Sequence, residues 1–146
     1  FPAVSIGIAA KIPVKTSHTV FESIDYGIYC SLSKKVRDFY FYCTLSSIYI
    51  KTIPEEFAVL KKNRLNATVV CEFRFNKSSS FIAQYTMGGA VATNYYELSN
   101  SSHEITIGYK KRFGTWMLEL GLLENTVFFD NSPDVGFHFG VSYFPS

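Results

Sequence analysis

The feature that most limits the fold of this chain is an alternation of bulky apolar residues with small or polar ones. In the last such segment, Val135, Phe137, Phe139, Val141 and Tyr143 alternate with Gly136, His138, Gly140 and Ser142. Because successive side chains of a β-strand point to opposite faces, a period of two predicts strands with one apolar face. The same pattern recurs in seven earlier segments, within residues 4–11, 24–32, 39–46, 68–75, 81–88, 105–110 and 115–122. The sequence therefore predicts eight strands in a single all-β domain over residues 1–146.

The connections between these segments are alternately short and long. Short polar turns are predicted near residues 33–37, 76–80 and 111–114, and longer links near 12–22, 52–66, 89–102 and 124–134. Short turns at one end and long loops at the other are typical of antiparallel up-and-down barrels of the outer membrane. One long link, "IPEEFAVLKKN", predicts a brief helix, because Pro54 suits a first turn and Glu55 and Glu56 suit the N-terminal dipole.

Charge and hydropathy exclude some classes of protein. Fourteen Lys and Arg residues against 12 Asp and Glu residues give a net charge of +2, and the basic residues are scattered, so we expect no nucleic-acid partner. No run of 18 apolar residues is present, which excludes a transmembrane helix. Barrel strands carry a much weaker hydropathy signal, so the absence of a long apolar run does not exclude a membrane-spanning barrel.

The three cysteines, Cys30, Cys43 and Cys71, are expected to act as small hydrophobic residues. Their odd number rules out complete internal pairing, and no zinc-type spacing is present. Across the predicted turn at residues 33–37, Cys30 should lie opposite Phe39–Phe41, several residues short of Cys43. We therefore predict no disulfide bond.

The alternation alone does not say which face of the strands is wet. A soluble, lipocalin-like barrel turns its apolar face inward, whereas a membrane barrel turns it outward to lipid. The small face here combines glycines with charges of both signs, which suits a narrow polar lumen better than a solvent-facing surface. The residues expected to face this lumen are Lys11, Asp25, Glu72, Arg74, Lys110, Glu119 and His138.

Aromatic residues near the predicted short turns also favour a membrane. Amphipathic rings concentrate at the interfaces of a bilayer, and here they would form a belt on the periplasmic side. Pairing across the short turns should bring Phe75 near Phe81 and Tyr109 near Trp116. The expected belt comprises Phe39, Phe75, Phe81, Tyr109, Trp116 and Tyr143.

Three stretches resemble a family of uncharacterised proteobacterial outer-membrane proteins, a domain of unknown function. "ELGLLENTVFFDNSPDVGFHFGVSYF" resembles its C-terminal signature, "DYGIYCSLSKKV" one of its strands, and "AKIPVK" its K-x-P-T-G element, with Val14 and Lys15 replacing Thr and Gly. The resemblance implies the outer membrane of a Gram-negative bacterium and no assigned activity. Family members are roughly twice as long, so the chain resembles their C-terminal half. The aromatic last strand also resembles the signal read by the outer-membrane assembly machinery, although Pro145 and Ser146 follow Phe144.

Two groups of residues could carry chemistry. His138, Ser142 and Glu119 are the types of a nucleophilic triad, as in outer-membrane lipid hydrolases. However, four residues along one strand separate His138 from Ser142 by roughly 13 Å, too far for a hydrogen bond. Asp130, Asn131 and Asp134 carry oxygen ligands that suit Ca²⁺, but their spacing is not that of an EF-hand and an Asx turn accounts for them. We expect no catalytic residue, no metal and no cofactor.

Together these observations predict an all-β, antiparallel up-and-down transmembrane β-barrel with about eight strands in this chain. Either residues 4–11 pair with residues 135–143 to close the barrel, or the chain is the C-terminal half of a larger one. The expected role is structural, adhesive or transport-related, in contact with the lipid bilayer and in an unspecified oligomeric state. The alternatives are a lipid-modifying outer-membrane enzyme and a soluble lipocalin-like ligand-binding barrel.

Overall fold

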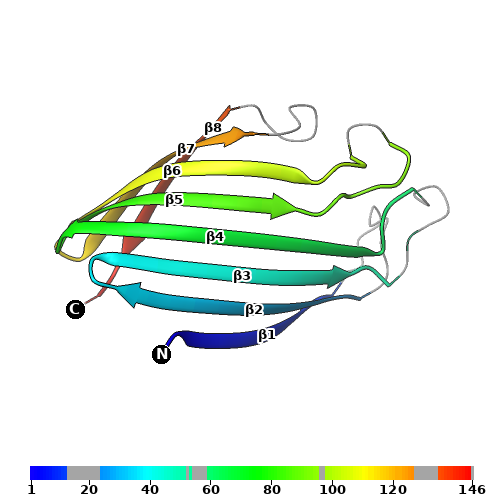
Figure 1. Ribbon diagram of the computed structural model, residues 1–146, viewed down its shortest axis with the longest axis horizontal. Coiled ribbons are helices and arrows are strands. Elements are labelled where there is room, and N and C mark those ends of the chain that lie inside the picture. The colour runs from blue at the N-terminus through cyan, green and yellow to red at the C-terminus, as the bar shows by residue number, and fades with distance from the viewer. Residues whose placement is uncertain (13–23, 52, 54–58, 96–97, 127–134, 146) are drawn as a thin grey trace.

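Eight antiparallel strands in one sheet make up the protein, as seen in a computed structural model of residues 1–146 (Figure 1). The structure describes residues 1–12, 24–51, 53, 59–95, 98–126 and 135–145. The strands follow one another in the sheet in chain order, so the predicted up-and-down arrangement of eight strands is confirmed. They are β1 (Ala3–Lys11), β2 (Asp25–Val36), β3 (Phe39–Tyr49), β4 (Asn63–Asn76), β5 (Ser79–Gly88), β6 (Ser102–Phe113), β7 (Trp116–Asn125) and β8 (Val135–Tyr143).

Three turns of two residues join the strands at one end of the sheet, on the left in Figure 1. In the β2–β3 turn, Arg37 has a φ of 55°, and in the β6–β7 turn, Gly114 has a φ of 61°. Two-residue hairpin turns need this left-handed backbone to match the twist of the strands. The third turn follows a register shift between Arg74 and Asn76 on β4.

The strands extend further toward these turns than the sequence predicted. β2 continues through Lys34 and Lys35, so Cys30 lies opposite Leu45, and Cys43 lies opposite Leu32. The expectation that Cys30 faces Phe39–Phe41 was therefore wrong: the charged residues were assigned to a turn, but they continue the strand. All three cysteines are free thiols in the structure.

The same cause corrects one predicted aromatic contact. β6 continues to Phe113, which lies opposite Trp116, whereas Tyr109 lies opposite Leu120 and Phe81. Tyr109 and Trp116 were expected to be neighbours, but the register separates them by four residues.

The two faces of the sheet differ in exposure. Bulky apolar side chains on one face are largely exposed, for example Ile107 at 63% and Phe137 at 85%. The opposite face is more covered and holds the buried Glu72 and Ser80. Among the described residues, Ala92 is the one buried hydrophobic residue, so the sheet encloses no apolar core. These two surfaces are called the apolar face and the polar face below.

The sheet is curved, but the described strands do not close into a barrel. Figure 1 shows β7 and β8 passing behind the strands β4 to β6. Within the described residues, β1 pairs with β2 alone and β8 with β7 alone, so the predicted pairing of residues 4–11 with 135–143 is not observed. Both outer strands have one open edge.

The strands are progressively staggered along their direction. One row of paired residues runs from Phe139 through Leu120, Tyr109, Phe81, Phe73 and Phe39 to Val36. Along β8, Tyr143 lies four residues from this row in the direction of the short turns. On the other outer strand, Ala3 pairs with Ser33, which lies three residues from the row in the direction of the long loops. The two outer strands are therefore offset by seven residues, roughly 23 Å. A stagger of this kind is what a sheet of tilted strands needs in order to form a barrel.

Helices play no part in the described fold. Within the residues that the structure describes, no helix is long and apolar enough to span a membrane. A brief helix was predicted in residues 53–63, of which 54–58 lie outside the described residues. Residues 59–63 are not helical, because Leu60 forms a β-bridge and Asn63 begins β4.

Candidate functional site

The polar face carries a cluster of charged side chains near the short turns, around Glu72 on β4, which is called the short-turn cluster below. Glu72 is 6% exposed and accepts a hydrogen bond of 2.8 Å from Nε of Arg74. The Arg74 guanidinium also lies over the ring of Tyr40, 4.0 Å from its centroid. A buried carboxylate is tolerated when it is paired and hydrogen-bonded, and Arg74 supplies both contacts.

A second set of contacts surrounds Glu119 on β7. Lys110 lies directly opposite Glu119, and its Nζ is 3.3 Å from Oε1. On the other side, Nε2 of His138 is 3.8 Å from Oε2 of the same carboxylate, an ion pair when the imidazole is protonated. Gly140 faces Glu119, and a Cβ there would approach the His138 Nε2 to 3.3 Å. The glycine thus leaves space for the imidazole beside the carboxylate.

Glu72, Arg74 and Lys110 line a cavity of about 350 Å³ on the polar face. Its lining comes from strands that are far apart in the sheet: Tyr42 from β3, Glu72 and Arg74 from β4, Lys110 from β6 and Met117 from β7. One cavity can be lined from so many strands only where the sheet curves inward. The polar face is therefore the concave one, and the apolar face is convex.

On the convex face, aromatic rings form a nearly continuous row near the short turns. Phe39 stacks on Phe73 with centroids 4.9 Å apart, and Phe75 lies 5.2 Å from Phe81 as predicted. Tyr109 continues the row at 5.5 Å from Phe81. A separate pair, Trp116 and Tyr143, has centroids 4.9 Å apart. All six residues of the expected belt therefore take part in ring contacts on one face.

Comparison with known proteins places the chain in a family. Residues 2–144 match the model of DUF3187, which is described as a protein of unknown function. The chain belongs to the DUF3187 family. No curated protein and no solved structure matches the chain.

In this DUF3187 chain, the residues expected to face a lumen separate into two groups. Five of them, Glu72, Arg74, Lys110, Glu119 and His138, lie together in the short-turn cluster. Lys11 and Asp25 lie opposite each other near the long-loop end of β1 and β2, with Nζ and Oδ2 separated by 3.8 Å. Their assignment as lumen residues stays a prediction.

Sequence reasoning missed several members of these groups. Tyr40 and Tyr42 alternate with Phe39 and Phe41, so their place on the polar face could have been read from the pattern. Arg64, which lines a pocket together with Lys11 and Asp25, was assigned to a loop, because the predicted strand began only at residue 68. It is in phase with Thr68, so extending that strand toward the N-terminus would have found it.

The candidate triad is only partly assembled. Glu119 lies beside His138, but Ser142 lies opposite Met117 and His138 opposite Gly121, four residues apart on β8. The structure thus unites the acid and the histidine, not the histidine and the serine.

The candidate calcium ligands Asp130, Asn131 and Asp134 lie outside the described residues. Elsewhere in the described chain, no three His, Cys, Asp or Glu side chains are close enough to hold a metal ion.

Proposed function

We propose that this chain forms the wall of a membrane-spanning β-barrel in the outer membrane of a Gram-negative bacterium, with a structural or transport role. Its convex face contacts lipid, and its concave face lines a polar lumen. The resemblance to longer outer-membrane proteins in the sequence "DYGIYCSLSKKV" and in the closing strand supports the location.

One observation carries the proposal: the apolar side chains lie on the exposed, convex face. Ile8, Ile107 and Phe137 are each more than half exposed, whereas charged residues occupy the concave side. A large continuous apolar surface is unstable in water and marks a surface that something apolar covers. Alternating apolar-out and polar-in residues around a curved antiparallel sheet are what a lipid-embedded barrel requires.

Strand length agrees with this role. The strands contain 9, 12, 11, 14, 10, 12, 10 and 9 residues. A tilted strand needs about 9–11 residues to cross the apolar part of a bilayer. The aromatic row near the short turns has the composition of an interfacial belt.

The alternatives need other arrangements of the same residues. A lipocalin-like binder needs the bulky apolar residues of its strands on the concave face, whereas this sheet holds them on the convex face and places Glu72, Lys110 and Glu119 on the concave one. A lipid-modifying enzyme needs a nucleophile in hydrogen-bond reach of a base, and Ser142 is four residues from His138. Paired charges on the concave face suit a structural or solute-guiding lumen.

Site-specific labelling tests which face meets lipid. Single cysteines would replace Ile107 and Phe137 on the convex face and their strand neighbours Thr106 and Gly136 on the concave face, with Cys30, Cys43 and Cys71 changed to Ala. Each would be labelled with a small fluorophore in the full-length protein, reconstituted in vesicles. Nitroxide-labelled lipids should quench the labels at Ile107 and Phe137 and leave those at Thr106 and Gly136 bright.

The matched positions make each outcome informative. Quenching at Thr106 and Gly136 in place of their neighbours would invert the assignment of the faces. A protein that stays in the aqueous fraction, with all four labels unquenched, would contradict the membrane proposal and favour a soluble binder. Fractionation of the native cells into inner and outer membranes tests the location separately.

A further inference from the structure

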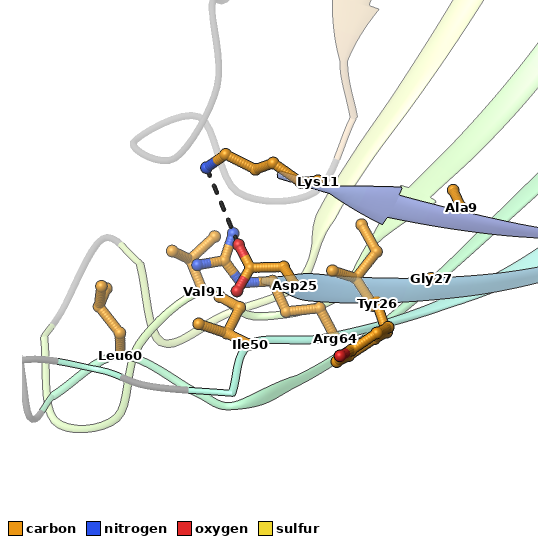
Figure 2. A pocket seen from close by; sticks show the side chains of 10 residues that line it. Ala9, Lys11, Asp25, Tyr26, Gly27, Ile50, Leu60, Arg64 and Val91 are labelled. Carbon is orange, nitrogen blue, oxygen red and sulfur yellow. Dashed lines mark ion pairs between the residues drawn. The ribbon is translucent and has the colours of Figure 1, made fainter. Parts of the chain in front are cut away.

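A second hollow of the described sheet lies at the opposite end from the short-turn cluster, beside the long loops. It has a volume of about 530 Å³, within the range of small-molecule sites. Its lining is mostly apolar, with three charged side chains among it, and Figure 2 shows these side chains from close by. The apolar wall includes Ala9, Ile48, Ile50, Leu60 and Val91.

Two small residues make the floor of this pocket. Ala9, Gly27, Ile48 and Arg64 lie in one row across β1 to β4, and all four line the pocket. A Cβ at Gly27 would meet Ala9 and the carbonyl of Ser47 at 3.7 Å, an ordinary contact. The neighbouring backbone therefore does not require a glycine, and a longer side chain at this position would occupy the hollow.

Two connections between strands hold the apolar wall in place. Leu60, before β4, pairs with Ala92, after β5, as an isolated β-bridge. The Lys61 amide donates to the Val91 carbonyl at 2.8 Å, and the Thr93 amide donates to the Val59 carbonyl at 2.6 Å. Ala92 is fully buried between them. The pocket is thus a built feature of the fold with positioned walls.

Two polar atoms in the pocket, one on Asp25 and one on Arg64, are unsatisfied among the described residues. Asp25 is paired with Lys11 at 3.8 Å, and the Asp25 side chain is 12% exposed and the Lys11 side chain 70% (Figure 2). Oδ1 of Asp25 and Nε of Arg64 are both buried, and neither has a hydrogen-bond partner among the described residues. Burying a donor or an acceptor without a hydrogen-bond partner costs free energy. A ligand with an acceptor for the Arg64 Nε and a donor for Oδ1 of Asp25 would therefore gain binding free energy from both contacts.

We propose that this pocket binds a small carboxylic acid that carries a hydroxyl or amino group next to the carboxylate and an aliphatic tail. The carboxylate accepts from the Arg64 Nε, and the adjacent hydroxyl or amino group donates to Oδ1 of Asp25. The tail packs against Ile48, Ile50, Leu60 and Val91. Among the described lining residues, Arg64 and Lys11 lie beside a single carboxylate, that of Asp25, so a ligand carboxylate opposite Arg64 is electrostatically favoured. This site does not depend on whether the convex face meets lipid.

Calorimetric titration of the full-length purified protein, in detergent where it needs one, tests the chemistry of the head. The probes are 2-hydroxyhexanoate and norleucine, with hexanoate as the acid that lacks the donor and hexylamine as the reversed charge. Because a hydrogen bond to a charged group is involved, the hydroxy or amino acid should bind roughly ten-fold more tightly than hexanoate. Hexylamine should not compete.

Substitutions then test each contact. Arg64→Met should weaken binding of all the acids about ten-fold or more, whereas Arg112→Met at the other end of the same face should not. Asp25→Ala should remove the advantage of 2-hydroxyhexanoate over hexanoate. Gly27→Leu should abolish binding, and Gly136→Leu, which adds the same side chain at a distant glycine on the same face, should leave it unchanged.

The proposal fails if neither acid binds at millimolar concentration, if hexylamine binds as well as the acids, or if Gly27→Leu binds normally. Circular dichroism checks that each variant folds. Should Gly27→Leu not fold, the comparison of 2-hydroxyhexanoate with hexanoate in Asp25→Ala decides, because an unchanged ratio there would exclude the contact with Asp25.

Discussion

Arg74 and Glu72 are joined by a hydrogen bond of 2.8 Å within one strand, yet they differ in their contact with solvent. The Glu72 side chain is 9% exposed and the Arg74 side chain 46%. Removing the arginine leaves a buried carboxylate without its partner. Removing the carboxylate leaves a guanidinium that water and the Tyr40 ring still stabilise.

The first prediction follows from this asymmetry. Arg74→Met should lower the free energy of unfolding by about 2 kcal/mol, and Glu72→Gln by about 1 kcal/mol or less. Urea unfolding of the full-length protein would measure both, with Lys77→Met in the adjacent turn as a control for the loss of a positive charge. Equal losses at Glu72 and Arg74 would show that burial does not set the cost.

The eight strands and the face of each side chain could be predicted, because an alternation of period two assigns residues to faces wherever the strand is taken to begin or end. The ends themselves could not, since Lys34, Lys35 and Arg112 look like turn residues but continue a strand on a curved sheet. The loop pocket depends on a bridge between Leu60 and Ala92, which lie 32 residues apart, and no local pattern predicts such a contact.

The corrected register can be tested with cysteine pairs. Residues directly opposite each other on antiparallel strands have Cα atoms about 4.5–5.5 Å apart, within the range that a disulfide needs. Leu32→Cys, in a chain with Cys30 and Cys71 changed to Ala, should therefore cross-link to Cys43 under mild oxidation. Cys30 and Cys43 are diagonal neighbours, about 7–8 Å apart, and should not. Mass spectrometry of the oxidised variant and of the oxidised native protein checks the two pairs separately, and a bond between Cys30 and Cys43 in the native protein would refute the register.

The two hairpin turns with a positive φ give a matched pair of predictions. Arg37 has a φ of 55°, which costs an ordinary residue about 1 kcal/mol, so Arg37→Asn should stabilise the protein by about that amount. Gly114 has a similar φ of 61°, and no atom lies within 4 Å of the position that a Cβ would take there. Gly114→Ala should therefore destabilise the protein by about 1 kcal/mol through the backbone alone. Chemical unfolding would measure both changes; the same sign for both would exclude this explanation.

The proposed lipid contact predicts a difference between neighbours on β6. Ile107 is 63% exposed on the convex face, and Ile107→Arg should cost about 2–4 kcal/mol near the middle of a bilayer. Thr106→Arg places the same charge on the concave face, where it meets polar groups and acts by crowding. Unfolding in vesicles compared with detergent separates the two effects, because the cost at Ile107 should depend on the bilayer and that at Thr106 should not.

The last prediction concerns the open edges of β1 and β8. In hydrocarbon, each unpaired backbone N–H or C=O costs several kcal/mol, so an open edge is not viable there. In the full-length protein reconstituted in a bilayer, the amides of β1 and β8 should therefore exchange hydrogen as slowly as those of the central strand β4. Fast exchange along either outer strand, with β4 protected, would contradict the membrane proposal.

What covers the edges is constrained by the faces of the strands. If β1 pairs directly with β8, the offset must be even, because an odd offset would turn the apolar residues of one strand toward the lumen. Ala3, at an offset of seven residues, is therefore not the partner of Tyr143. Val4 and Ile6 lie eight and ten residues from Tyr143 along the strands, so one of these two residues should pair with it. Cysteines at Val4 and Tyr143, or at Ile6 and Tyr143, should cross-link within one chain in that case. If the exchange data show covered edges and neither pair cross-links, further strands lie between β1 and β8, and the barrel is larger than eight strands.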